Sequence, residues 1–212
     1  MKKLILMIAT VLAMITTSMA QIVENDTRGQ IQLGIKAGLN FSNVYDAQGE
    51  EFHADGKVGL ALGGFIAIPI GAYLGLQPEV LLSQKGFKAT GKILGSTYDF
   101  KRTTTYIDVP ILFALKPIEY LTILAGPQYS YLIKQNDVFT NATTSIQQEQ
   151  EFENDNLRRN IFGFVGGLDV NMQPFVFSVR VGWDISKNNG DGTSTTPRYK
   201  NVWYQATIGL RF

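Results

Sequence analysis

The chain has 212 residues, of which 45% are hydrophobic and 11% aromatic, with 21 glycines and no cysteine. Its 19 basic and 18 acidic residues almost cancel, which excludes a strongly basic nucleic-acid-binding surface. The absence of cysteine excludes disulfides and a lipid-anchored lipoprotein. The length suits one domain, and the many glycines and aromatic residues favour an all-β protein.

The N-terminal residues have the pattern of an export signal. Lys2 and Lys3 precede an apolar run over 4–15, and the small residues Ser18 and Ala20 fit a cleavage site after residue 20. An uncleaved anchor helix is the alternative. Cleavage would remove two of the 19 basic residues, leaving 17 against 18 acidic ones and a net charge of −1. The predicted organisation is a signal peptide over 1–20, a short periplasmic segment over 21–30 and one barrel domain over 31–212.

Apolar residues alternate with small or polar ones in eight segments, as expected of β-strands with two different faces. These segments are 31–41, 58–70, 74–85, 106–116, 121–134, 162–171, 175–185 and 201–212. In the last one, Tyr204 and Ile208 share a face, and Gln205 and Arg211 share the other. Strands of about ten residues with this alternation are typical of transmembrane barrels. The sequence therefore predicts an all-β fold, an eight-stranded antiparallel up-and-down transmembrane β-barrel.

The predicted connections form two classes. Short links lie near 71–72, 117–119 and 173–174, whereas longer polar stretches lie at 42–57, 89–105, 135–160 and 187–200. Short turns at one end and long loops at the other are the outer membrane arrangement, with the short turns in the periplasm. An even strand number then places both the N-terminus and the C-terminus of the barrel domain in the periplasm, and the predicted location is the outer membrane.

A soluble eight-stranded barrel is the structural alternative, and it would turn its apolar faces inward. The polar faces carry too many ions for a dry core. They are Lys36, Glu79, Asp108, Asp169, Arg180 and Arg211. Aromatic residues near segment ends also predict two interfacial girdles. They are Phe41, Tyr73, Tyr106, Tyr120, Tyr131, Trp183, Trp203 and Phe212.

Five motifs resemble the PorT-like outer membrane β-barrel family, which is common in Bacteroidota and has OmpA/OmpX-like eight-stranded members. They are the segments 34–42 (GIKAGLNFS), 76–86 (LQPEVLLSQKG), 106–112 (YIDVPIL), 125–129 (AGPQY) and 208–212 (IGLRF). In the third motif, Asp108 stands where the family usually has Glu. The resemblance implies fold and location. It extends to a role beside a secretion apparatus only by analogy between folds. It also implies that the aromatic Phe212 is an assembly signal for the insertion machinery.

Eight strands enclose an interior that side chains just fill. We therefore expect the six ions of the polar faces to form a network of salt bridges in the lumen, because buried charges must be paired. Structural packing is the favoured role. A narrow ion path or a proton-linked gate is the alternative.

The residue inventory predicts no enzyme, no cofactor and no metal site. A nucleophilic serine needs a base, and the one histidine, His53, lies in a predicted loop. With one histidine and no cysteine, zinc ligands are lacking. The predicted function is that of a structural or interaction protein whose long loops meet a surface or secretion-apparatus partner. A narrow porin-like channel is the alternative. Lipid and the insertion machinery are the other expected partners, nucleic acid is not one, and the chain is expected to be a monomer.

Overall fold

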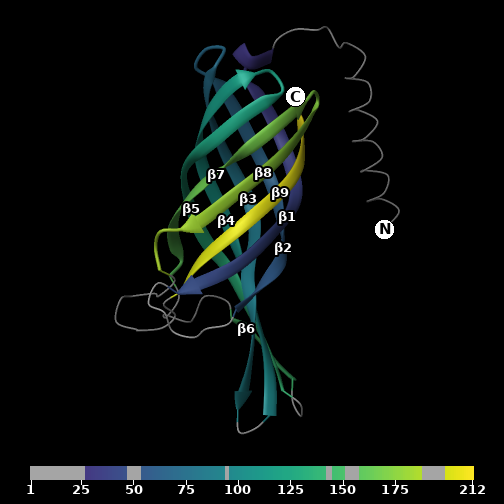
Figure 1. Ribbon diagram of the computed structural model, residues 1–212, viewed down its shortest axis with the longest axis vertical. Helices are drawn as coiled ribbons and strands as arrows, with labels where there is room; N and C mark the ends of the chain where they lie inside the picture. The colour runs from purple at the N-terminus through teal and green to yellow at the C-terminus, as the bar shows by residue number, and fades with distance from the viewer. Residues whose placement is uncertain (1–26, 47–53, 94–95, 142–144, 151–157, 188–198) are drawn as a thin grey trace, which may run out of the picture.

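The computed structural model describes residues 27–46, 54–93, 96–141, 145–150, 158–187 and 199–212. Within these ranges the chain forms a closed barrel of eight antiparallel strands (Figure 1). The elements are the 3₁₀ turn η1 (Thr27–Gly29) and the strands β1 (Gln32–Asp46), β2 (Ala54–Pro69), β3 (Leu74–Ile93), β4 (Ser96–Ile118), β5 (Leu121–Asn141), β6 (Ser145–Gln150), β7 (Asn160–Met172), β8 (Phe175–Asp184) and β9 (Tyr199–Arg211). The predicted fold class is confirmed.

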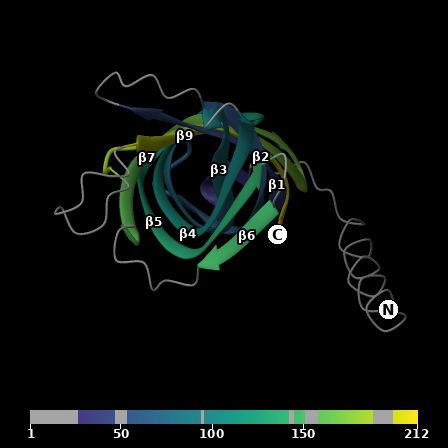
Figure 2. The same ribbon diagram turned by 90° about the horizontal axis from the view of Figure 1, so that it is seen from below.

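The barrel closes between its first and last strands, as Figure 2 shows end-on. β9 pairs with β1 from Gly34↔Arg211 to Asp46↔Tyr199, and the other neighbours follow in chain order apart from β6. β6 lies outside the ring and pairs with the far end of β5, from Gln135↔Gln150 to Thr140↔Ser145. Closure leaves the eight ring strands without a free edge in the wall, which removes the risk of edge-to-edge aggregation there.

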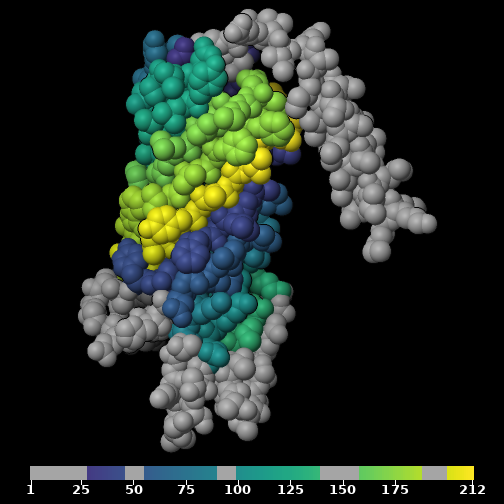
Figure 3. All heavy atoms as spheres, turned by 45° about the vertical axis from the view of Figure 1, so that its right-hand side comes forward, coloured from purple at the N-terminus to yellow at the C-terminus, as the bar shows by residue number. Residues whose placement is uncertain are grey.

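Side chains in the wall have the orientation expected for a barrel surrounded by lipid. Along β8 the pattern alternates strictly in its first half: Phe175, Phe177 and Val179 are exposed, whereas Ser178 and Arg180 are buried. β9 follows the same rule, with Gln205 buried and Tyr204 exposed. Figure 3 shows the outer side chains of neighbouring strands packed into a continuous wall. The apolar surface therefore faces outward and the polar surface inward, which excludes the soluble alternative.

Three strands extend much farther than the sequence predicted. The stretches 89–105 and 135–160 were expected to be loops, but β3 and β4 continue as a hairpin to Ile93 and Ser96. β5 likewise continues to Asn141 and pairs with β6. The polar character of these stretches reflects a sheet that leaves the apolar band, because strands outside the membrane do not need an apolar face. In Figure 1 these strands project together from the end opposite the C-terminus.

Two of the aromatic residues assigned to the girdles lie inside the barrel instead. Tyr106 is 2% exposed and Trp203 is 1% exposed, because both lie on the lumenal parity of their strands. Outward-facing aromatic rings near the projecting end include Phe41, Tyr131 and Trp183, and Tyr73 and Tyr120 lie near the other end. In the described part of the chain, no helix has the length and apolar character needed to cross a membrane.

Candidate functional site

The lumen holds the polar residues that the alternation turned inward, and glycines on neighbouring strands make room for the longest of them. Lys36 on β1 pairs in register with Gly63 of β2 and Gly209 of β9. Arg180 on β8 lies opposite Gly167 of β7, where a Cβ atom would be only 2.8 Å from the Arg180 Cδ. Glycine at these positions therefore allows the long cationic side chains to pack directly against the neighbouring backbone.

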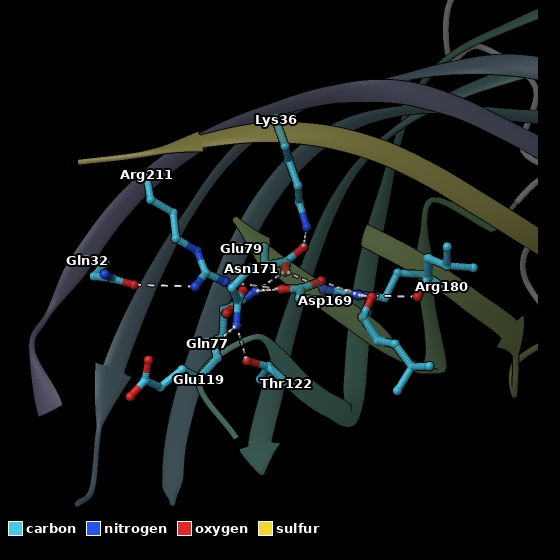
Figure 4. Close-up of polar contacts among 12 residues, drawn as sticks. Gln32, Lys36, Gln77, Glu79, Glu119, Thr122, Asp169, Asn171, Arg180 and Arg211 are labelled. Carbon is cyan, nitrogen blue, oxygen red and sulfur yellow. Dashed lines mark hydrogen bonds and ion pairs between the residues drawn. The ribbon is translucent and has the colours of Figure 1, made fainter. Parts of the chain in front are cut away.

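Five charged side chains from five strands meet in one cluster, shown in Figure 4. Lys36 Nζ forms an ion pair with Glu79 Oε2, and Arg180 Nη2 lies 3.5 Å from Glu79 Oε1. Arg180 Nη1 lies 2.7 Å from Asp169 Oδ1, and Arg211 Nη2 lies 3.5 Å from Asp169 Oδ2. We call Lys36, Glu79, Asp169, Arg180 and Arg211 the five-residue cluster.

Neutral amides hold the two carboxylates of this cluster in place. Gln77 Nε2 donates to Glu79 Oε1 at 2.9 Å and to Asp169 Oδ2 at 3.3 Å. Arg211 Nη1 also donates to Gln32 Oε1 at 3.4 Å, at the beginning of β1. The carboxylates thus bridge β1, β3, β7, β8 and β9 across the interior. Hydrogen bonds to ionised groups are stronger than neutral ones, so the cluster ties distant strands together.

Asp108, the sixth predicted residue, is not part of this cluster. Its carboxylate pairs with Lys85 Nζ, which lies 3.2 Å from Oδ1 and 3.0 Å from Oδ2. The Lys85 ammonium also lies 3.7 Å from the centroid of the Trp203 ring and 5.0 Å from that of Tyr106, which adds cation–π attraction. We call Lys85, Asp108, Tyr106 and Trp203 the Lys85 cluster.

Sequence reasoning did not include Lys85 or Asp184 among the site residues. Lys85 has the same parity on β3 as Glu79, so the alternation itself marked it as lumenal. Asp184 ends β8, and its Oδ2 accepts hydrogen bonds from the backbone and side-chain nitrogens of Asn201. That partner comes from β9, and a single sequence does not reveal which residues of two strands face each other.

Uncharged side chains fill the rest of the interior. Gln205 Nε2 donates to Asn40 Oδ1 at 2.9 Å, and Asn40 Nδ2 donates to Ser83 Oγ at 2.8 Å. An apolar cluster lies among them, with side chains from β4, β5, β7 and β9. It consists of Leu112, Ala114, Leu124, Val165 and Trp203. The lumen is therefore a packed interior in which charged and apolar side chains lie next to one another, as Lys85 and Trp203 do.

A further layer lies where the strands leave the barrel toward the projecting hairpin. Arg102 Nε donates to Asp137 Oδ1 at 2.8 Å, and Arg102 Nη2 donates to Asp137 Oδ2 at 2.7 Å. This two-pronged geometry is the strongest form of such a pair. Beside it the buried Val44, Phe87 and Ala89 pack together, with Phe100 against them. The interior thus continues into the base of the extension.

The remaining predicted positions are located as follows. Phe212 is 63% exposed, and its backbone N–H donates to Leu33 O at 2.8 Å at the β1–β9 seam. His53 lies outside the described residues. Within the described ranges, no three His, Cys, Asp or Glu side chains are grouped so as to hold a metal ion.

A closed antiparallel barrel with an apolar outside and a charged, filled interior has the architecture of an integral outer membrane protein. The family model described as "Outer membrane protein beta-barrel domain" matches residues 19–188. The chain belongs to this family.

Among solved structures, the chain is similar to Ail, the attachment invasion locus protein of Yersinia pestis. The two are 15% identical over 85% of this chain and 98% of that one, with a TM-score of 0.48. It is also similar to Neisserial surface protein A, at 9% identity over 85% and 97% of the chains and a TM-score of 0.49. For OprG from Pseudomonas aeruginosa the identity is 13%, the shares are 87% and 98%, and the TM-score is 0.40. Among curated protein sequences, none matches significantly.

Proposed function

We propose that this protein is a sealed barrel that acts as a surface interaction protein, through the strands and loops beyond its apolar band. The observation that carries this proposal is the contrast between a filled interior and a long extension. The barrel is oriented so that the first strand begins and the last strand ends on the periplasmic side, while the projecting hairpin lies outside the cell. The short connections near the C-terminus support that orientation.

The packing of the interior argues against a path for solutes. Glu79, Asp169 and Arg180 are each no more than 2% exposed, and so are the apolar Leu112 and Leu124. A hydrated channel would leave water in contact with these groups. Opening one would also require ion pairs to separate inside the barrel, which costs several kcal/mol for each buried charge left without a partner.

The extension is far longer than the membrane requires. A tilted strand crosses the bilayer with about 9–11 residues, whereas β4 has 23. The last large apolar residue of β4 that is exposed on that side is Ile107, and farther out Lys101 and Asp99 occupy the outward parity. The residues 96–105 therefore extend about 33 Å along the strand beyond the apolar band. Strands of this length give a partner a fixed, hydrogen-bonded surface, because their backbone is already paired.

Planar-bilayer recording on the refolded protein tests the sealed lumen. We expect no conductance steps from the wild-type chain. As a positive control, Arg180→Ala and Leu112→Ala introduced together remove a large cation and an apolar side chain from the lumen, and this variant should conduct more readily. Reproducible steps from the wild type would replace our proposal with the narrow-channel alternative.

Site-specific photocrosslinking in intact cells tests the interaction surface. A crosslinking residue at Asp99, on the outward face of the extension, should capture a discrete protein. The same residue at Phe113, in the apolar band, should capture lipid only. Equal surface levels of the two variants are the required control. Identical protein adducts from both positions, or none from Asp99, would contradict the docking role.

The proposal also extends to the class of protein that the extension binds. The order of the five motifs supports a PorT-like assignment within the broader family. Such an assignment makes a component of a secretion apparatus the first partner to test. The crosslinked protein from Asp99 would identify it directly.

A further inference from the structure

Basic side chains follow one another around the outer end of the barrel, where β5, β7, β8 and β9 leave the apolar band. We call the following residues the basic rim: Lys134, Arg158, Arg159, Lys187 and Lys200. All five side chains are at least partly exposed. The projecting strands continue well beyond the outer ends of β7, β8 and β9 (Figure 1). The basic rim therefore lies at the base of the extension, close to the membrane surface.

The backbone places these cations on neighbouring strands. Arg159 lies beside β5, because its carbonyl oxygen accepts a hydrogen bond from the Leu132 N–H at 2.8 Å. β8 lies beside β7 at the same end, since the Ile185 N–H donates to Phe162 O at 2.8 Å. β9 follows β8 in the sheet. The five cations thus form one rim across four adjacent strands.

The basic rim begins where the outward apolar side chains end. Lys187 comes two residues after Ile185, which is 59% exposed, and Lys200 comes two residues before the outward-facing Val202. Two residues span at most about 7 Å. Three aromatic rings face outward just inside the rim: Tyr131, Phe162 and Trp183. Because headgroups lie directly outside the hydrocarbon core, the cations of the rim lie at the depth of lipid headgroups.

Among the described side chains of β5, β7, β8 and β9, no carboxylate faces the rim. Asp137 pairs with Arg102, Asp169 belongs to the five-residue cluster, and Asp184 is 1% exposed inside the barrel. Along the chain, residues 186–200 contain three basic residues and one acidic residue. The part of the rim on β8 and β9 therefore keeps a net positive charge.

The opposite end of the barrel has no matching rim among the described residues. Lys116 and Arg211 have the lumenal parity there, and the carboxylate of Glu119 is exposed. Arg28 lies over the Tyr73 ring, 5.4 Å from its centroid. Cations that serve any phospholipid surface would be expected at both ends. The asymmetry indicates a ligand that is present in one leaflet only.

We propose that the basic rim binds the phosphate groups of a phosphorylated glycolipid in the outer leaflet, whose acyl chains lie against β7, β8 and β9. A zwitterionic phospholipid carries its own ammonium group, whereas a glycolipid phosphate has a net negative charge that the rim neutralises. Hydrogen bonds from Lys and Arg to phosphate are charge-assisted and strong. The inference rests on the orientation given under the proposed function, which puts the rim in the outer leaflet, and needs no protein partner.

Native mass spectrometry of the full-length refolded protein in a non-ionic detergent tests the site. The probe is diphosphorylated lipid A, and the matched ligand is the same lipid A after enzymatic removal of its phosphates. We expect the dephosphorylated lipid to bind about tenfold more weakly or worse. Inorganic phosphate at the same concentration should not compete, because the acyl chains supply part of the affinity. Equal affinity for the two lipids, or displacement by inorganic phosphate, would overturn the proposal.

Two double variants make the test specific to the rim. Lys187→Gln with Lys200→Gln should weaken binding of phosphorylated lipid A by about fivefold for each lysine and leave the dephosphorylated lipid unaffected. Lys88→Gln with Lys101→Gln removes two exposed cations from the extension and should change neither affinity. An equal loss in both variants would assign binding to overall charge and refute the site. If the first variant does not fold, the comparison of the two lipids on the wild type still decides.

An acidic stretch of the chain itself is the alternative occupant of the rim. Glu151, Glu153 and Asp155 precede Arg158 in the sequence. Introducing Glu151→Gln, Glu153→Gln and Asp155→Asn together should leave the affinity for lipid A unchanged. A large gain in affinity would show that these carboxylates cover the rim in the wild type, and it would contradict the proposal. Neither result alters crosslinking from Asp99, so failure of this site is distinguishable from failure of the docking role.

Discussion

Asp169 is the carboxylate on which the charged lumen depends most, and Asp169→Asn is the sharpest perturbation of it. The aspartate lies 2.7 Å from Arg180 and 3.5 Å from Arg211. At an effective dielectric constant of about 20, these contacts correspond to about 6 and 5 kcal/mol of gross Coulomb energy. Desolvation offsets much of this, and removing one partner of a buried pair costs about 3–5 kcal/mol. We expect the free energy of unfolding to fall by that amount.

Urea unfolding in lipid vesicles, followed by tryptophan emission, measures this loss. Trp183→Phe in every variant leaves Trp203 as the one tryptophan, and because Trp203 lies inside the barrel, its emission then reports on the lumen. Asp99→Asn is the matched control, because the exposed carboxylate should contribute no more than about 0.5 kcal/mol. A loss below about 1 kcal/mol for Asp169→Asn would refute the view that these charges are buried and mutually dependent.

A second substitution separates charge balance from packing. Asp169→Asn leaves three cations facing one carboxylate, and adding Arg211→Gln brings the excess back to one. The double variant should therefore lose less stability than the sum of the two single variants, with a coupling of about 1 kcal/mol or more. Strict additivity would mean that Asp169 and Arg211 do not interact.

Three further predictions concern the rest of the barrel. Lys85→Met leaves the Asp108 carboxylate buried without its cation, so unfolding should become easier by about 3–5 kcal/mol, with a shift in the emission of Trp203; unchanged emission would contradict the contact. Leu112→Ala opens a cavity in the apolar wall and should cost about 2–5 kcal/mol, whereas Phe113→Ala should cost less because lipid fills the space; the reverse order would invert our assignment of faces. The folded barrel should also migrate differently on SDS gels before and after boiling, and identical migration would count against a closed barrel.

Much of the barrel was predictable because the period-two alternation determines which face of each strand is apolar. The wall strands cover the predicted segments except for one end residue in four of them, and Glu79 and Arg180 have the lumenal parity that the pattern indicated. The ends of β3, β4 and β5 were not predictable in the same way. Outside the membrane a strand needs no apolar face, so the alternation fades while the hydrogen-bonded ladder continues.

Which lumenal residues contact one another could not be predicted from the sequence either. Parity shows that Lys36 and Asp108 point inward, but their heights depend on strand tilt and register. Those determine that Lys36 meets Glu79 and that Asp108 meets Lys85. The position of Trp203 illustrates the same limit. Its place near a segment end favoured a position in an interfacial girdle. Its parity instead points the ring into the lumen, and Gly182, its partner on β8, has no Cβ atom to obstruct the ring there.

A scan of single cysteines along β9 tests the central claim most directly, and the chain has no native cysteine to interfere. Spin labels at Tyr204, Ala206 and Ile208 should relax with oxygen, which concentrates in lipid. Labels at Gln205 and Thr207 should respond neither to oxygen nor to a water-soluble paramagnetic reagent, because the lumen is filled. Access of the aqueous reagent to Gln205 and Thr207 would show a hydrated pore and contradict the sealed barrel.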